Sequence, residues 1–158
     1  MTFDSESVRA TREQMLLRLL FRATEAMNSD MAERIRARGF ADFQPSFTAL
    51  LANIDTEGTR IGAIAARLGT TRQASSQLLS EIEDRGYVER VADPEDGRAV
   101  IARHTASGRR ILLTAIDVML QIEGEYAEIL GGDGLSRMKR LLRRLVDATD
   151  PAGSLGRG

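Results

Sequence analysis

A run of hydrogen-bonding side chains within residues 72–80 is the part of this sequence best suited to recognising another molecule. At helical spacing these side chains share one face, and no carboxylate on that face would repel phosphate. Arginine can bond the O6 and N7 atoms of guanine in a bidentate manner, and glutamine can do the same to N6 and N7 of adenine. Serine hydroxyls can reach a base or a phosphate. The face consists of Arg72, Gln73, Ser76, Gln77 and Ser80.

The alternative interpretation is that this face is the ordinary solvent-exposed side of an amphipathic helix. Any amphipathic helix has a polar face, although most such faces are richer in Glu and Lys than in Ser and Gln. Residues 59–110 hold nine arginines and seven acidic residues, a net charge of +2 in a chain whose net charge is −1. Coding bias of the source genome would also favour arginine. The predicted buried face of the same helix holds Ala74, Ser75, Leu78, Leu79 and Ile82.

A short helix that ends before Gly69 must hold the polar helix in place. Gly62 is an acceptable N-cap, and the predicted buried side holds Ile61, Ile64, Ala65 and Leu68. Gly69 permits a tight turn that other residues would strain. Thr71 can cap the second helix by accepting a bond from a backbone N–H two or three residues on. The pattern therefore predicts a helix-turn-helix, and the major groove of duplex DNA, about 12 Å wide, admits one helix.

A β-hairpin is predicted directly after the second helix. Residues 87–92 and 99–103 alternate in strand fashion, and Pro94 with Asp96-Gly97 supplies turn chemistry between them. Arg98 lies at the tip, where Asp96 can pair with it and hold its guanidinium forward. An arginine in this place suits the negative potential of a narrow minor groove. The alternative is an exposed turn with an ordinary ion pair.

The remainder of the chain reads as amphipathic helices with more apolar surface than a small winged domain needs. An intersubunit bundle in a homodimer would cover it, and an intramolecular bundle in a monomer is the alternative. Thr105 is a good N-cap for the longest C-terminal helix. The predicted helices cover residues 5–38, 45–54, 105–130 and 135–148.

These elements predict a mainly α-helical fold with a small β-hairpin wing, in which a winged helix-turn-helix is joined to a helical dimerisation region. The winged domain is placed at residues 43–104. The dimerisation region takes residues 5–38 and 105–149, and residues 150–158 form a disordered tail rich in Gly and Pro.

Composition narrows the function classes. The 158 residues suffice for one ordinary core, and the absence of cysteine excludes disulfides and thiolate metal sites. A single histidine cannot build a regulatory metal site with several histidine ligands, so neither a metal nor a cofactor is expected. No run of about 18 apolar residues predicts a membrane span. The N-terminal residues show no export signal, and a cytoplasmic location is expected.

Three motifs in order resemble the MarR family of bacterial winged helix-turn-helix regulators: RLGTTRQASSQLLSEIEDRGYVER, DPEDGR and TASGRR. The resemblance implies a homodimer that binds a pseudo-palindromic operator on double-stranded DNA, usually as a repressor. It also implies a minor-groove contact from Arg98, oriented by Asp96. The candidate DNA-binding residues are Arg60, Thr71, Arg72, Gln73, Ser76, Gln77, Ser80, Asp96 and Arg98.

Three positions depart from the family pattern. Gln44 stands where a threonine commonly caps the second helix. Ser75 stands where an apolar residue is usual, which predicts looser local packing. His104 replaces the usual leucine before Thr105 and is expected to be a partly exposed strand residue.

The resemblance further implies a small aromatic or phenolic effector that binds between the dimerisation region and the DNA-binding lobe. Met and Phe at helical spacing are also ordinary core residues, so a purely structural role is the alternative. The candidate pocket residues are Phe21, Met27, Phe43, Phe47 and Met119.

Two other function classes were weighed. A winged-helix protein-interaction module would keep the fold without DNA binding. A small helical enzyme would need a nucleophile, a base or a metal constellation, and the sequence offers none. The GGDG run at residues 131–134 lies at a helix break with no preceding strand, unlike a phosphate-binding loop. The sequence therefore predicts a protein that is not an enzyme.

Overall fold

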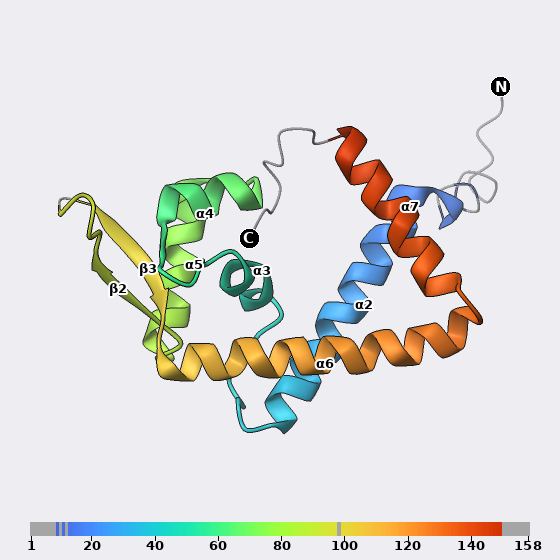
Figure 1. Ribbon diagram of the computed structural model, residues 1–158, viewed down its shortest axis with the longest axis horizontal. Coiled ribbons are helices and arrows are strands. Elements are labelled where there is room, and N and C mark those ends of the chain that lie inside the picture. Colours follow the sequence, from blue (N-terminus) through green and yellow to red (C-terminus); the bar gives the residue numbers. More distant parts are fainter. Residues whose placement is uncertain (1–8, 10, 12, 98, 150–158) are drawn as a thin grey trace.

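The computed structural model describes residues 9, 11, 13–97 and 99–149. Figure 1 shows a small winged lobe at one end and three long helices at the other. In the described part of the chain, no helix is both long and apolar enough to cross a membrane. The elements are α2 (Leu16–Ala37), α3 (Phe47–Ala52), β1 (Thr59–Arg60), α4 (Ile61–Leu68), α5 (Arg72–Asp84), β2 (Val88–Ala92), β3 (Val100–His104), α6 (Ala106–Leu130) and α7 (Gly134–Thr149).

The winged lobe, residues 43–104, contains the predicted hairpin and one strand that the sequence did not predict. β2 pairs antiparallel with β3 from Val88↔His104 to Ala92↔Val100, which confirms the hairpin. β1 adds a third strand beside β3, so the sheet order is β1-β3-β2. A two-residue strand is too short to show alternation, and its pairing depends on a segment about forty positions further along the chain.

The helix-turn-helix forms through the local chemistry expected of it. Gly69 ends α4 in the left-handed conformation, with φ 62° and ψ 29°. The hydroxyl of Thr71 accepts a hydrogen bond of 3.1 Å from the Ala74 amide and so caps α5. The predicted cap at Gly62 is wrong, because the chain leaves β1 directly into α4 and Arg60 holds the N-cap position.

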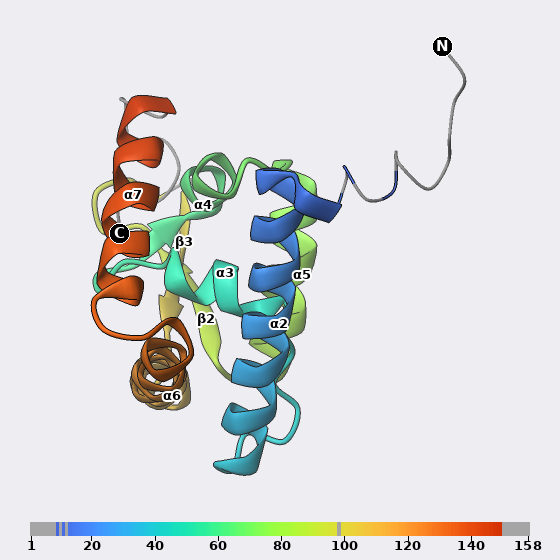
Figure 2. The ribbon, with the colours of Figure 1, turned by 90° about the vertical axis from the view of Figure 1, so that its right-hand side faces the viewer.

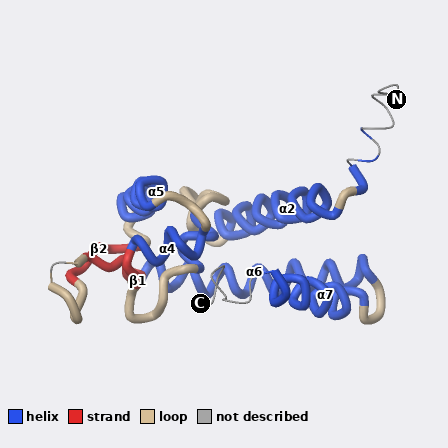
Figure 3. Tube along the Cα trace, turned by 90° about the horizontal axis from the view of Figure 1, so that it is seen from above, coloured by secondary structure: helices blue, strands red, loops and turns tan. Residues whose placement is uncertain are grey.

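The outer helices α2, α6 and α7 extend away from the winged lobe (Figure 3). Figure 2 views them from their far end, where α6 is seen along its axis and α2 and α7 lie on opposite sides. α2 packs across α6, where Arg34 bonds both Asp30, at 2.8 Å, and Glu125, at 2.6 Å. The predicted single helix over residues 5–38 is interrupted at Met15, which adopts an extended conformation between the helical residues 9, 11, 13 and 14 and the start of α2 at Leu16. Residues 5–8 and the predicted tail at 150–158 lie outside the described residues.

The core lies where α2, α3, α5 and α6 meet. The Phe43 and Phe47 rings meet edge to face with centroids 5.9 Å apart, an arrangement that aromatic pairs favour. The core also takes side chains from α4 and β2. The fully buried large side chains of the core are Met31, Ile35, Phe43, Phe47, Leu50, Ile64, Leu79, Ile82, Val88, Ile111, Val118 and Ile122.

His104 is buried, which corrects the expectation of a partly exposed histidine. The residue is 5% exposed and ends β3 beside the last turn of α3 and the start of α6. Neither ring nitrogen makes a hydrogen bond of ordinary geometry. A Cβ added at Gly108 would lie 3.2 Å from its Nδ1 and 1.9 Å from the Tyr87 carbonyl oxygen, so only glycine fits there. Burial lowers the pKa of His104, partly offset by the backbone of Leu51 and Ile54.

This burial predicts a pH dependence of stability near neutrality. Burial disfavours the protonated form of His104 in the folded protein, whereas the unfolded chain takes up a proton near pH 6.5. The unfolded state then binds more protons, so the free energy of unfolding decreases as pH falls from about 7.5 to about 5.5, above the range where carboxyl groups ordinarily titrate. Urea denaturation at several pH values measures the effect.

His104→Leu is the matched control, because it keeps an apolar bulk at the position and removes the titrating group. Its unfolding free energy should be flat over the same pH interval. Equal pH slopes for the two proteins would contradict the assignment to His104.

Candidate nucleic-acid interface

One side of helix α5 is buried and holds the helix against the rest of the protein. Leu79 and Ile82 are fully buried, and the helix contacts α3 and β2. Ser75 is 3% exposed, and its hydroxyl lies 2.8 Å from that of Thr70. The predicted loose packing at Ser75 is therefore wrong, because the Thr70 hydroxyl satisfies the buried serine. Ala74, predicted on the buried face, is exposed.

The opposite edge of α5 is free to meet another molecule. Arg72, Gln73 and Gln77 are exposed and make no hydrogen bond or ion pair with any residue that the structure describes. The first turn of α5 carries no acidic residue. The N-terminus of a helix also carries partial positive charge, which favours a nearby phosphate. This edge therefore combines unoccupied donors with a potential suited to an anionic polymer.

Of the two predicted serines, Ser80 contacts the wing through its hydroxyl and Ser76 through its backbone carbonyl oxygen. The Ser80 hydroxyl donates to the Ser76 carbonyl oxygen at 3.0 Å and accepts a 3.0 Å bond from Nη2 of Arg90. Both serines are half-buried. Sequence reasoning missed Arg90, because nothing in the strand pattern shows which side chain faces α5.

Arg60 has an exposed side chain that binds the loop of the wing. Its Nε donates to Oδ2 of Asp93 at 2.6 Å, and Asp93, 7% exposed, also accepts from the Glu95 amide at 2.9 Å. The Glu95 amide, followed by Arg60, lowers the pKa of Asp93. Asp96 lies 3.9 Å from Nη2 of Arg60. Arg98 lies outside the described residues, so its pairing with Asp96 stays a prediction.

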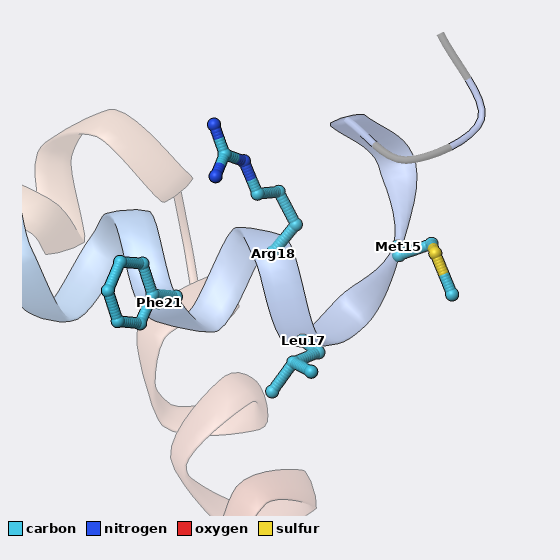
Figure 4. Close-up of a pocket in the computed structure, with 4 residues that line it drawn as sticks. All are labelled: Met15, Leu17, Arg18 and Phe21. Carbon is cyan, nitrogen blue, oxygen red and sulfur yellow. The ribbon is translucent and has the colours of Figure 1, made fainter. Parts of the chain in front are cut away.

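The five candidate effector residues do not gather at one place. Phe43 and Met119 line a cavity of about 190 Å³ between α2, α3 and α6, together with Thr48, whose buried Oγ1 has no hydrogen-bond partner among the described residues. Phe47 is in the core, and Met27 is half-buried on α2 and does not line this cavity. Phe21 is 56% exposed and lies near the start of α2, beside Met15, Leu17 and Arg18 (Figure 4).

Comparison with known proteins shows a match to one family model. The MarR family model matches residues 34–99, which span the end of α2, the helix-turn-helix and most of the wing. This part of the chain is therefore similar to the MarR family. Among curated relatives, the transcriptional regulator HosA of Escherichia coli O111:H- is 28% identical over 105 residues, covering 66% of this chain and 78% of the relative.

A second relative and a solved structure extend the match. An HTH-type transcriptional repressor of Mycobacterium tuberculosis is 26% identical over 127 residues, covering 80% of this chain and 90% of the relative. The transcriptional repressor CouR, solved bound to a 23-mer DNA duplex, superposes with a TM-score of 0.68 at 26% identity, covering 84% of this chain and 93% of CouR. These relatives are transcriptional regulators, not enzymes.

The Arg60–Asp93 contact predicts how the wing of this protein responds to a substitution. Replacing Arg60 with Gln removes the charged partner of Asp93, so the loop at residues 93–97 should open more often. Amide hydrogen exchange of the free protein should become faster at these residues.

Arg72→Gln is the control, because Arg72 is exposed and contacts no part of the wing. It should leave wing exchange unchanged. If Arg60→Gln also leaves it unchanged, Arg60 does not anchor the wing.

Proposed function

We propose that this protein is a sequence-specific transcriptional repressor of the MarR family that binds a pseudo-palindromic operator as a homodimer and is released by a small-molecule effector. The observation that carries the proposal is the acid-free, unpaired edge of α5 next to an anchored wing. An α-helix so presented fits the major groove, and its arginine and glutamines match purine base edges.

The two parts of the interface divide the work of recognition. Arg72, Gln73 and Gln77 extend from the first two turns of α5 and can reach base edges or flanking phosphates. The wing approaches the neighbouring minor groove, where Arg98 supplies positive charge. Phosphate contacts position a protein on DNA, and base contacts give sequence preference. Thr71, another candidate, acts indirectly, because its hydroxyl caps α5.

The homodimer is supported by apolar surface that a single chain leaves uncovered. None of the sixteen residues of α7 is buried. Soluble monomers rarely expose apolar patches of this extent, and a second copy would cover them. The exposed large apolar residues of the outer helices include Leu16, Leu17, Leu19 and Phe21 on α2, Leu113, Ile116, Leu120 and Ile129 on α6, and Met138, Leu141, Leu145 and Val146 on α7.

The cavity between α2, α3 and α6 supports release by an effector. It lies where the winged lobe meets the outer helices, so a bound molecule can change their relative orientation. Its volume of about 190 Å³ suits one aromatic ring, since a cavity of about 150 Å³ accepts benzene. Among the described residues no charged side chain lines it, and the Thr48 hydroxyl is one polar group available to a ligand. We therefore expect an uncharged, single-ring effector with one hydrogen-bonding group.

DNA recognition by α5 is tested with duplexes that the protein selects from a random pool. Arg72→Ala or Gln77→Ala should weaken binding to the selected duplex by ~1–3 kcal/mol and relax preference at one position in each half-site. Fluorescence anisotropy on base-substituted duplexes measures both effects.

Arg144→Ala, on the exposed face of α7, is the control and should bind as the wild type does. Equal weakening on every duplex would assign Arg72 and Gln77 to phosphate contacts. Failure of the wild type to bind any duplex at low salt would favour a protein-interaction module.

The effector site is tested with the ligand pair p-cresol and toluene. Calorimetry should show tighter binding of p-cresol, because its hydroxyl can pair with Thr48. Thr48→Val should reduce the affinity for p-cresol by about 1 kcal/mol and leave that for toluene nearly unchanged. The anion 4-methylbenzoate should not bind, because burying an unpaired carboxylate is costly. Binding of 4-methylbenzoate as tight as that of p-cresol would contradict the expected ligand class.

A further inference from the structure

Arg90 bridges the wing and the recognition helix. It lies in the middle of β2, paired in register with Ala102 of β3. Its guanidinium extends to α5, where Nη1 donates to the Glu83 carboxylate and Nη2 donates to the Ser76 carbonyl oxygen at 3.1 Å and the Ser80 hydroxyl at 3.0 Å. The Arg90 backbone amide also donates to Oε1 of Glu83 at 3.2 Å.

These bonds reach α5 along one stripe. Residues 76, 80 and 83 are spaced by four and three positions, so they follow one side of the helix over two turns. Only a planar guanidinium presents several donors in a fixed fork, so a single side chain can hold all three points. The arrangement restrains both the rotation of α5 about its axis and its tilt against the sheet.

The positive charge of Arg90 is already paired with an acidic side chain. Its side chain is 27% exposed, and the Glu83 carboxylate neutralises it. Arg72 differs, because it is exposed and has no acidic partner in the described structure. The position of Arg90 between helix and strand therefore suits a structural contact within the protein better than a contact with phosphate.

We propose that Arg90 is a positioning residue that fixes the recognition helix against the wing and thereby sets sequence discrimination. The inference rests on the proposed function, in which α5 reads base edges. Bidentate bonds to bases are directional and tolerate little rotation of the helix, whereas charge–phosphate attraction tolerates more. Loss of Arg90 therefore weakens binding to the preferred sequence and leaves general attraction to DNA in place.

Two substitutions of Arg90 separate geometry from charge. Arg90→Gln removes the charge, and Arg90→Lys keeps the charge without the fork. Dissociation constants are measured for the selected duplex and a scrambled duplex at several salt concentrations. Both variants should weaken binding to the selected duplex about tenfold, with unchanged affinity for the scrambled duplex and an unchanged salt slope.

Arg103→Gln is a matched control. Arg103 lies on the adjacent strand β3, pairs with Glu89 at 2.9 Å and makes no hydrogen bond or ion pair to α5. The substitution removes the same charge and an Arg–Glu pair from the same sheet. It should leave the ratio of the two dissociation constants unchanged.

Two outcomes would overturn the proposal. If Arg90→Gln weakens both duplexes equally, lowers the salt slope by about one and is rescued by Arg90→Lys, then Arg90 is a phosphate contact. If neither variant changes the ratio of dissociation constants, Arg90 has no positioning role. Thermal unfolding confirms that each variant is folded, and Ser80→Ala, which removes one of the three points, gives a milder second variant with a smaller loss in the same direction.

Hydrogen exchange of the free protein separates this proposal from the proposed function. Arg90→Gln should speed amide exchange in residues 76–84, and Arg103→Gln should not. If exchange is unchanged after Arg90→Gln, Arg90 does not hold α5 against the wing, whether or not the protein binds DNA. Absence of duplex binding by the wild type, with exchange altered as expected, would instead contradict the proposed function alone.

Discussion

Burial of one edge of α5 is the constraint on which the rest of the interface depends. Leu79 and Ile82 are fully buried in the core that Phe47 and Leu50 of α3 share. Because that edge cannot rotate outward without exposing apolar surface, the edge with Arg72 and Gln77 must face away from the protein. Hydrophobic packing thus presents the helix, and polar bonds from the wing refine its angle.

The outer helices differ in how much of their surface is buried. α2 and α6 contribute residues to the same core as the winged lobe, whereas α7 has no buried residue and contacts α6. The uncovered apolar side chains of α2, α6 and α7 need a partner, and a second copy supplies the same surface by symmetry. A two-fold pair of recognition helices is what a pseudo-palindromic operator requires. In the proposed function, the dimer and the two-fold DNA site therefore follow from one architecture.

Local chemistry was predictable, and long-range contacts were not. The turn at Gly69, the caps at Thr71 and Thr105 and the hairpin follow from residues close in sequence, and all are confirmed. The strand β1, the burial of His104 and the reach of Arg90 depend on segments distant in sequence. Apolar periodicity also cannot tell which side chain lines a cavity, so Phe43 and Phe21 looked alike although the structure separates them.

Selection of bound duplexes from a random DNA pool tests the central claim most directly. Two α5 helices related by two-fold symmetry should enrich a palindromic consensus whose half-sites are centred about 10–10.5 base pairs apart, one turn of the duplex. Enrichment of a single half-site without symmetry would contradict the paired arrangement. Absence of any enrichment, even at low salt, would contradict DNA recognition by this protein.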